Sequence, residues 1–470
     1  MLLALRKIFF YALLILYLII TPTIILHALG YMIDPGERSF YKTGLVSVVT
    51  EPKNAILYVG GKKFSGKTPA AIHDLLPGHY PIRLARKGYG SWEKEIEILP
   101  EKATRLEPVV LLPYKPEVET VSARPYRNFI PGIVDFKIYA WEGETLDTLR
   151  RIDLIFRRET PVGQKVPDAG HMKIVKVFYK EGSGLALFEI EKERTRKYLA
   201  LDLSQGKFFD LHEGDAGFSG RVEWDPKDSS RVYALNGGIV SWRELRSGKS
   251  HAPALAEPAY GFGAQHNHLY FLKKDFSLVE TNRSGESPKA LFEKNEPGPA
   301  IFKKSTASFY EIASFRRDIF KKDLFLFLGN HGELLSNWSP YHLVPREVKG
   351  FQYATAGDEE KILYWTSQEI GVIYLQKETE TAFEKVLSAE VLFSGGKNIQ
   401  QAFWAYEDSH AVFRDGNRVL ILETKNETPH LVRGISVAAP ESNIFYDNRG
   451  HAVFYLDPGT RNLMKRKITD

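Results

Sequence analysis

A chain of 470 residues is longer than one typical domain, so its length predicts two or three domains. Hydrophobic residues make up 43% and charged residues 26%, which is the composition of folded and not of disordered proteins. The net charge of +5 is small and the basic residues are scattered, so the basic stripe of a nucleic-acid-binding protein is missing. Cysteine is absent, which excludes disulfides, thiolate metal sites and cysteine nucleophiles.

The first predicted element is a membrane-spanning helix from Ile8 to Gly30, a stretch of 23 residues without a charge. As a helix it would be about 34 Å long, enough to cross a hydrocarbon core of roughly 30 Å. Arg6 and Lys7 precede it, and a basic flank stays on the cytoplasmic side. We therefore expect a cytoplasmic stub and single-pass anchor in residues 1–33, a juxtamembrane linker in 34–42, and the remaining chain outside the cytoplasm.

Two alternatives for this segment remain open. Ala28-x-Gly30 has the small residues of a signal-peptide cleavage site, so the segment could be a cleaved signal sequence. Its apolar run is longer than the usual signal core of roughly 7–15 residues, which favours a retained anchor. A buried core helix is the other alternative, and the uniformly apolar composition argues against it.

Residues 43–113 alternate between apolar and polar side chains, which predicts a small β-sandwich with one solvated face. Within them, Gly61–Thr68 fits the G-x-x-x-x-G-K-[ST] pattern of a phosphate-binding loop. That loop requires a helix beginning at its Lys and Thr, here Lys67 and Thr68, and Pro69 follows at once. We therefore expect no nucleotide binding.

The same region carries an ordered set of motifs. It runs through Pro52, Ala55–Gly61, Gly66–Pro69, Leu76–Tyr80 and Arg86–Tyr89. In order and spacing the set resembles a PEGA domain, with Gly60-Gly61 in place of the common Asp-Gly or Asn-Gly turn. The resemblance implies a small β-sandwich of a kind found at bacterial and archaeal cell surfaces, with no catalytic residues to transfer.

The remaining chain is expected to be a Pro-rich linker in 114–124 and a β-propeller in 125–470. Short aromatic and β-branched runs alternate there with hairpin turns such as Asp415-Gly416, and similar units recur about every 40–50 residues. That period is one four-stranded blade, so we predict seven blades within a range of six to eight. Glu223–Pro226 resembles the blade-opening turn of WD40-like propellers. Two stacked β-sandwiches are the alternative.

A closed ring needs its two ends to meet, because an open ring would leave a strand edge unpaired. Strand-like sequence lies near both ends, around Ile133–Tyr139 and Leu463–Ile468. We therefore expect these two segments to lie in one blade or in adjacent blades. The predicted fold class is all-β, with one N-terminal transmembrane helix.

Few residues in this chain suggest chemistry. His266 and His268 would project to one face of a strand but lack a third metal ligand, Asp225 and Asp228 lack calcium-loop spacing, and Gly217–Gly220 is not a nucleophile elbow. Glu359-Glu360 is interpreted as surface charge. We assign no catalytic, cofactor-binding or metal residues, and no cofactor. The tryptophans of the long β-region are candidates for both core packing and ligand binding: Trp141, Trp242, Trp338, Trp365 and Trp404.

These observations favour a membrane-anchored cell-envelope binding or scaffold protein that presents a propeller for protein or glycan recognition. The expected partners are the membrane, through Ile8–Gly30, and an envelope protein or polysaccharide, with no nucleic acid. The alternative is an extracytoplasmic propeller enzyme that processes glycans or uses a cofactor as hydrolase or oxidoreductase. A cluster of carboxylates at the central pocket would favour the enzyme, and an aromatic wall without one would favour the binder.

Overall fold

The structure is a computed structural model. It describes residues 2–28, 30–33, 40–132, 136–179, 184–210, 222–225, 231–236, 239–244, 250–255, 257–265, 267–292, 302, 305, 307–315, 323–337, 341–345, 347–356, 359–375, 388–425 and 429–469.

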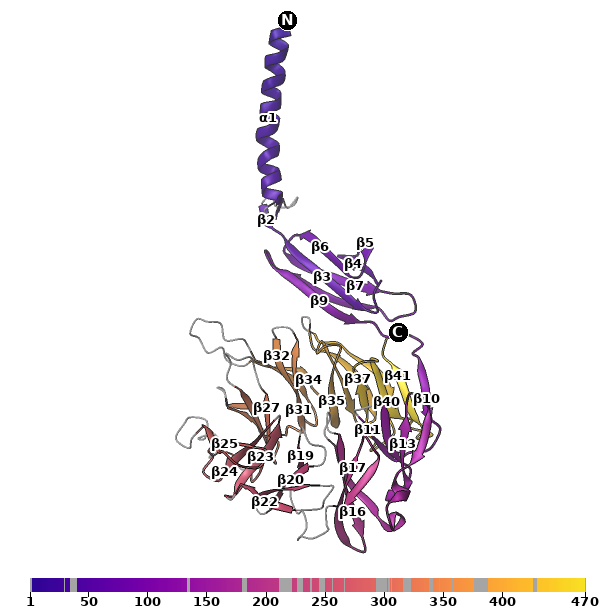
Figure 1. Ribbon diagram of the computed structural model, residues 1–470. Coiled ribbons are helices and arrows are strands. Elements are labelled where there is room, and N and C mark those ends of the chain that lie inside the picture. Colours follow the sequence, from indigo (N-terminus) through magenta and orange to yellow (C-terminus); the bar gives the residue numbers. More distant parts are fainter. Residues whose placement is uncertain are drawn as a thin grey trace.

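Helix α1, Leu2–Ala28, extends away from the body of the protein (Figure 1). Its segment Phe9–Leu26 has a mean hydropathy of 2.4, and none of it is buried against the body. Phe9 and Tyr17 are each more than half exposed. The core-helix alternative is therefore wrong, and a membrane span or a signal sequence remains. A short ribbon of β1, Tyr31–Ile33, and β2, Phe40–Lys42, follows the helix.

Residues 43–113 form a two-sheet sandwich because alternate side chains of each strand point inward. In β8, Trp92, Ile96 and Ile98 are buried while the intervening glutamates are exposed. The chain continues from Lys67 into a strand, where a phosphate-binding loop would need a helix. One sheet holds β6 (Ala70–Leu75), β3 (Gly44–Glu51) and β9 (Ala103–Val110), and the other β5 (Lys62–Lys67), β4 (Ile56–Val59), β7 (Gly78–Ala85) and β8 (Trp92–Ile98).

The long β-region is a propeller, and its described residues form eight four-stranded antiparallel blades, numbered here in chain order. Eight is the upper end of the predicted range, one more than the preferred count of seven. Blade 1 consists of β11 (Asn128–Gly132), β12 (Lys137–Trp141), β13 (Leu149–Asp153) and β14 (Arg158–Pro161), and blade 2 of β15 (Lys173–Tyr179), β16 (Leu185–Lys192), β17 (Thr195–Asp202) and β18 (Lys207–Asp210). Blade 3 consists of β19 (Val222–Trp224), β20 (Arg231–Asn236), β21 (Ile239–Glu244) and β22 (Ser250–Leu255). Blade 4 consists of β23 (Ala259–Gln265), β24 (His268–Lys273), β25 (Leu278–Asn282) and β26 (Lys289–Phe292). Blade 5 consists of β27 (Tyr310–Phe315), β28 (Leu324–Gly329), β29 (Leu334–Ser336) and β30 (His342–Val344). Blade 6 consists of β31 (Gly350–Ala356), β32 (Glu359–Trp365), β33 (Ile370–Leu375) and β34 (Ser388–Phe393). Blade 7 consists of β35 (Ile399–Ala405), β36 (His410–Asp415), β37 (Arg418–Glu423) and β38 (Val432–Val437).

Blade 8 closes the ring with strands from both ends of the region. Its strands β39 (Phe445–Asp447), β40 (Ala452–Leu456) and β41 (Leu463–Lys467) are joined by β10, Val118–Ser122, which pairs antiparallel with β41. The segment expected to be a linker, 114–124, therefore supplies the outermost strand of the closing blade. Strand β12 lies in the adjacent blade, and Ile138 packs in one apolar cluster with Phe454 and Leu463, so the expected adjacency of the two ends is confirmed. Residues 133–135 lie outside the described residues.

The ring is tightest between blades 4 and 5, where β23 and β27 pair in parallel and join the two blades into one sheet. Gly261 and Gly263 of β23 allow this approach. A Cβ atom on either glycine would lie 2.1 or 2.2 Å from the carbonyl oxygen of Tyr310 or Ile312. No larger residue fits between these two backbones.

A central cavity as the candidate functional site

A cavity of about 1510 Å³ occupies the centre of the propeller. The innermost strands β11, β15, β23, β27, β31, β35 and β39 all contribute to its wall, and so does Asp225, which directly follows β19. Because each blade turns its first strand toward the axis, one wall is assembled from residues more than 300 positions apart. The cavity exceeds the roughly 300–1,000 Å³ of a typical small-molecule pocket.

Side chains of the innermost strands bridge neighbouring blades around this cavity. The first strand of each blade has an edge that its own blade does not pair, so its main-chain N–H groups need acceptors from elsewhere. A Gln or Glu on the preceding inner strand supplies that acceptor at four places. The pairs are Glu223 Oε2 with Ala264 N at 3.0 Å, Gln265 Oε1 with Ser314 N at 2.8 Å, Gln352 Oε1 with Trp404 N at 3.0 Å, and Gln401 Oε1 with Ile444 N at 2.8 Å.

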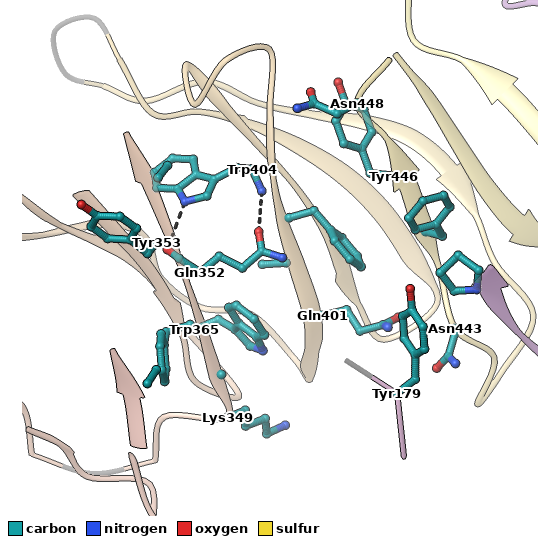
Figure 2. Close-up of a pocket in the computed structure, with 18 of the residues that line it drawn as sticks. Tyr179, Lys349, Gln352, Tyr353, Trp365, Gln401, Trp404, Asn443, Tyr446 and Asn448 are labelled. Carbon is teal, nitrogen blue, oxygen red and sulfur yellow. Dashed lines mark hydrogen bonds between the residues drawn. The ribbon is translucent and has the colours of Figure 1, made fainter. Parts of the chain in front are cut away.

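Aromatic rings concentrate on the part of the wall built by blades 5, 6 and 7 (Figure 2). Each ring is half-buried, because one side packs on the apolar cluster between two blades and the other side borders the cavity. This aromatic sector consists of Phe315, Phe351, Tyr353, Trp365, Phe403 and Trp404.

The tryptophans of the aromatic sector are held in different ways. The Trp404 indole Nε1 donates to the main-chain oxygen of Gln352 at 3.1 Å, which fixes the ring against β31. The Trp365 ring lies directly over Gly350, where a Cβ atom would meet it at 2.4 Å. The Trp365 Nε1 atom is buried and has no hydrogen-bond partner among the described residues. It is a donor that a ligand could satisfy.

Two carboxylates of the wall already face cations. Asp225 accepts hydrogen bonds from the Tyr233 hydroxyl at 2.8 Å and from Arg283 Nε at 2.7 Å. Burial and the Asp225 carboxylate raise the pKa of Tyr233, so this phenol stays protonated. Asp408 lies 3.3 Å from the ammonium groups of both Lys361 and Lys425. In the described part of the chain, no group of three or more His, Asp or Glu residues is arranged to hold a metal ion.

The candidate residues from the sequence divide between the core and the cavity. Trp365 and Trp404 border the cavity, whereas Trp141 is 5% exposed in the cluster between blades 1 and 2. Trp242 packs beneath the Arg231 guanidinium, 3.9 Å from its ring centroid, away from the cavity wall. His268 pairs with Glu280 at 2.8 Å. Outside the described residues lie Trp338, His266, Asp228 and 217–220.

The bridging glutamines were missed by the sequence analysis. A usable signal was present, because Gln352 and Gln401 are separated by 49 positions, which is about one blade period. Recognising it requires knowing which strand of each blade is innermost.

The sandwich is fixed to the propeller by a buried polar joint. Lys94 Nζ of β8 lies 3.1 Å from Glu423 Oε2 at the end of β37, and the two side chains are only 2% and 3% exposed. Trp92 Nε1 donates to the other oxygen of Glu423 at 3.2 Å. From the propeller side, Arg433 donates to the carbonyl of Val110 and Leu431 packs on the apolar core of the sandwich. The sandwich thus lies between α1 and the propeller in a defined orientation (Figure 1).

Comparison with known proteins identifies the sandwich. The PEGA domain family matches residues 43–110. No curated protein matches the chain by sequence.

Solved structures resemble the propeller at low sequence identity. The computationally designed Ika8 protein is 11% identical with a TM-score of 0.45, covering 75% of this chain and 100% of its own. YCF48 from Cyanidioschyzon merolae is 12% identical with a TM-score of 0.36, covering 63% and 95%. The Cps50 (Swd1) β-propeller domain from Myceliophteria thermophila is 9% identical with a TM-score of 0.36, covering 63% and 97%.

Proposed function

We propose that this chain, in which a PEGA domain joins one apolar helix to an eight-bladed β-propeller, is a membrane-anchored binding protein of the cell envelope. In this proposal α1 is the anchor, the PEGA domain is a spacer, and the propeller cavity is the recognition site for an envelope protein or polysaccharide. The observation that carries the proposal is the buried Lys94–Glu423 joint. It holds the propeller cavity in one orientation relative to the PEGA domain, as a presenting scaffold requires.

The proposed orientation follows from the charges that flank the helix. Arg6 and Lys7 would stay on the cytoplasmic side, which puts the PEGA domain and the propeller outside. The exposed apolar side chains of α1 would then lie in lipid, where burying them is favourable.

The chemistry of the cavity supports binding more than catalysis. A general acid or base needs a carboxylate with a tuned pKa within reach of a substrate. Asp225 and Asp408 face cations. The other two carboxylates of the wall are on different blades, Glu311 on β27 and Glu407 in the turn after β35, whereas the aromatic sector spans three neighbouring blades. Apolar rings combined with a few fixed polar groups are typical of a ligand-binding cavity.

Membrane fractionation of the full chain tests this proposal. With an epitope added after Asp470, the protein should stay in the pellet after alkaline carbonate extraction, and trypsin added to intact spheroplasts should digest the body. The matched control is the same chain lacking residues 1–30, which should be released by carbonate. Release of the full chain by carbonate, protection of its body from trypsin, or a mature N-terminus at Tyr31 would each contradict the anchored arrangement.

A further inference from the structure

We infer that the aromatic sector of the cavity binds an uncharged oligosaccharide. This inference rests on the proposed function, because it takes the cavity to be the recognition site and specifies the chemistry of its ligand. It is carried by three properties of the wall: its aromatic rings, its polar side chains and the charges along it.

The aromatic rings give the wall a surface suited to sugar rings. The six rings of the sector lie on β27, β31, β32 and β35, so they form one continuous side of the cavity. Packing between the blades holds them in place; the Phe315 and Tyr353 ring centroids, for example, are 4.3 Å apart. Rigid, half-exposed rings bury apolar area at low conformational cost when a flat apolar surface lies against them. The C–H faces of pyranose rings are such surfaces.

The bridging glutamines determine which polar groups face a ligand. Gln265 and Gln401 each use Oε1 to accept a main-chain N–H, so the Nε2 amino group is the part of the carboxamide left for a ligand. The buried Trp365 Nε1 adds another donor. These groups need acceptors. The wall also carries the carboxylates of Glu311 and Glu407, which accept hydrogen bonds. A sugar hydroxyl accepts and donates through the same oxygen, so it can pair with both kinds of group.

An extended peptide fits this wall less well. Its side chains project alternately to opposite sides of the chain, so it does not present a continuous flat apolar face to the rings of the aromatic sector.

The charge and size of the cavity specify the sugar further. Asp225 and Asp408 already face Arg and Lys side chains, and Lys349 donates to Asn398 and to the Ile399 carbonyl. A uronic acid or phosphate would have to disrupt these pairs to gain a counter-charge, so a neutral or N-acetylated chain is favoured. Glu311 and Glu407 add further carboxylates to the wall, which disfavours an anionic ligand. The volume of about 1510 Å³ is larger than one sugar ring would fill, so the cavity accommodates a chain of several rings.

The experiment measures ligand binding to the full chain by calorimetry and tryptophan fluorescence, in a detergent without a sugar headgroup. The probes are maltohexaose, cellohexaose and hexa-N-acetylchitohexaose, compared with hexagalacturonate and with reduced, carboxymethylated α-lactalbumin as an unfolded polypeptide. We expect at least one neutral hexasaccharide to bind, and Trp404→Ala to weaken that binding at least tenfold. Trp242→Ala is the matched control, since this tryptophan lies away from the cavity, and should leave the affinity unchanged.

Each outcome of this experiment either supports the sugar inference or overturns it. If Trp404→Ala alters the melting temperature, Tyr353→Leu replaces it as the cavity variant. Binding of hexagalacturonate or of unfolded α-lactalbumin alone, lost in the cavity variant, would overturn the sugar inference while leaving the cavity as the recognition site. Binding of no probe up to millimolar concentration, or sugar binding equally sensitive to Trp242→Ala, would overturn the inference, and carbonate extraction would still test the anchor independently.

Discussion

The buried joint between the PEGA domain and the propeller makes a quantitative prediction. Replacing Lys94 by Met would leave the Glu423 carboxylate 3% exposed and without its ammonium partner. Removing one member of a buried ion pair costs about 3–5 kcal/mol, because the remaining charge stays desolvated. The equilibrium constant for docking should therefore fall roughly a hundred- to a few-thousand-fold.

A single buried thiol can report this change, because the chain has no cysteine of its own. Val110 is 0% exposed and packs in the cluster between blades 7 and 8, so a Val110→Cys thiol reacts only after the domains separate. When closing is faster than labelling, the labelling rate is proportional to the population of the open state. Lys94→Met should raise that rate by the factor given above.

Two further variants make the test specific. Adding Glu423→Gln to Lys94→Met removes the buried negative charge and keeps an acceptor for Trp92, so it should restore much of the lost docking energy. Lys102→Met, at an exposed PEGA residue, is the matched control and should change nothing. An unchanged labelling rate in Lys94→Met, or strictly additive effects in the double variant, would refute the coupling argument.

Two other predictions concern the propeller. Gly261→Ala should destabilise the propeller by about 1–3 kcal/mol in urea unfolding, because the new Cβ would lie 2.1 Å from the Tyr310 carbonyl oxygen. The control Gly434→Ala should be nearly neutral, because its Cβ would have nothing within 4 Å. Equal effects of the two substitutions would contradict the close approach of β23 and β27. Burial, helped by nearby Arg433, lowers the pKa of His410 to about 3, against about 6.5 when unfolded. The unfolded state binds more protons between these values, so stability should fall as pH drops below 6.5, by about 2 kcal/mol at pH 5. His410→Asn should remove this component, and an unchanged pH slope in that variant would argue against it.

Local patterns made the N-terminal part predictable from sequence. The apolar helix and the PEGA motifs depend on the order and spacing of neighbouring residues, which the sequence displays directly. Alternation in β8 even places Lys94 on the buried face between Trp92 and Ile96. Its partner Glu423 is 329 positions away, and no local pattern connects the two.

The propeller was predictable as a period but not in its details. The outer strand of blade 8, Val118–Ser122, was not predicted because it lies among prolines that indicate a linker, and only its pairing with β41 makes it a strand of the ring. The cavity was unpredictable for a related reason. Trp365 and Trp404 face it while Trp141 is buried between blades, and that difference depends on the position of each strand relative to the axis.

The wall of the cavity includes strands of both blade 1 and blade 8, and the pairing of β10 with β41 ties these two ends of the ring together, so a designed disulfide across that pair tests the account most directly. Glu119 and Lys465 are directly opposite in the antiparallel register, at a Cα separation that a disulfide can span. Glu119→Cys with Lys465→Cys in the full chain should lose both free thiols on mild oxidation and gain about 2–4 kcal/mol of stability. Glu119→Cys with Arg466→Cys should keep its thiols free, because adjacent residues of a strand point to opposite faces. Free thiols in the first pair, or equal bridging in both, would contradict the closed ring and with it the proposed recognition cavity.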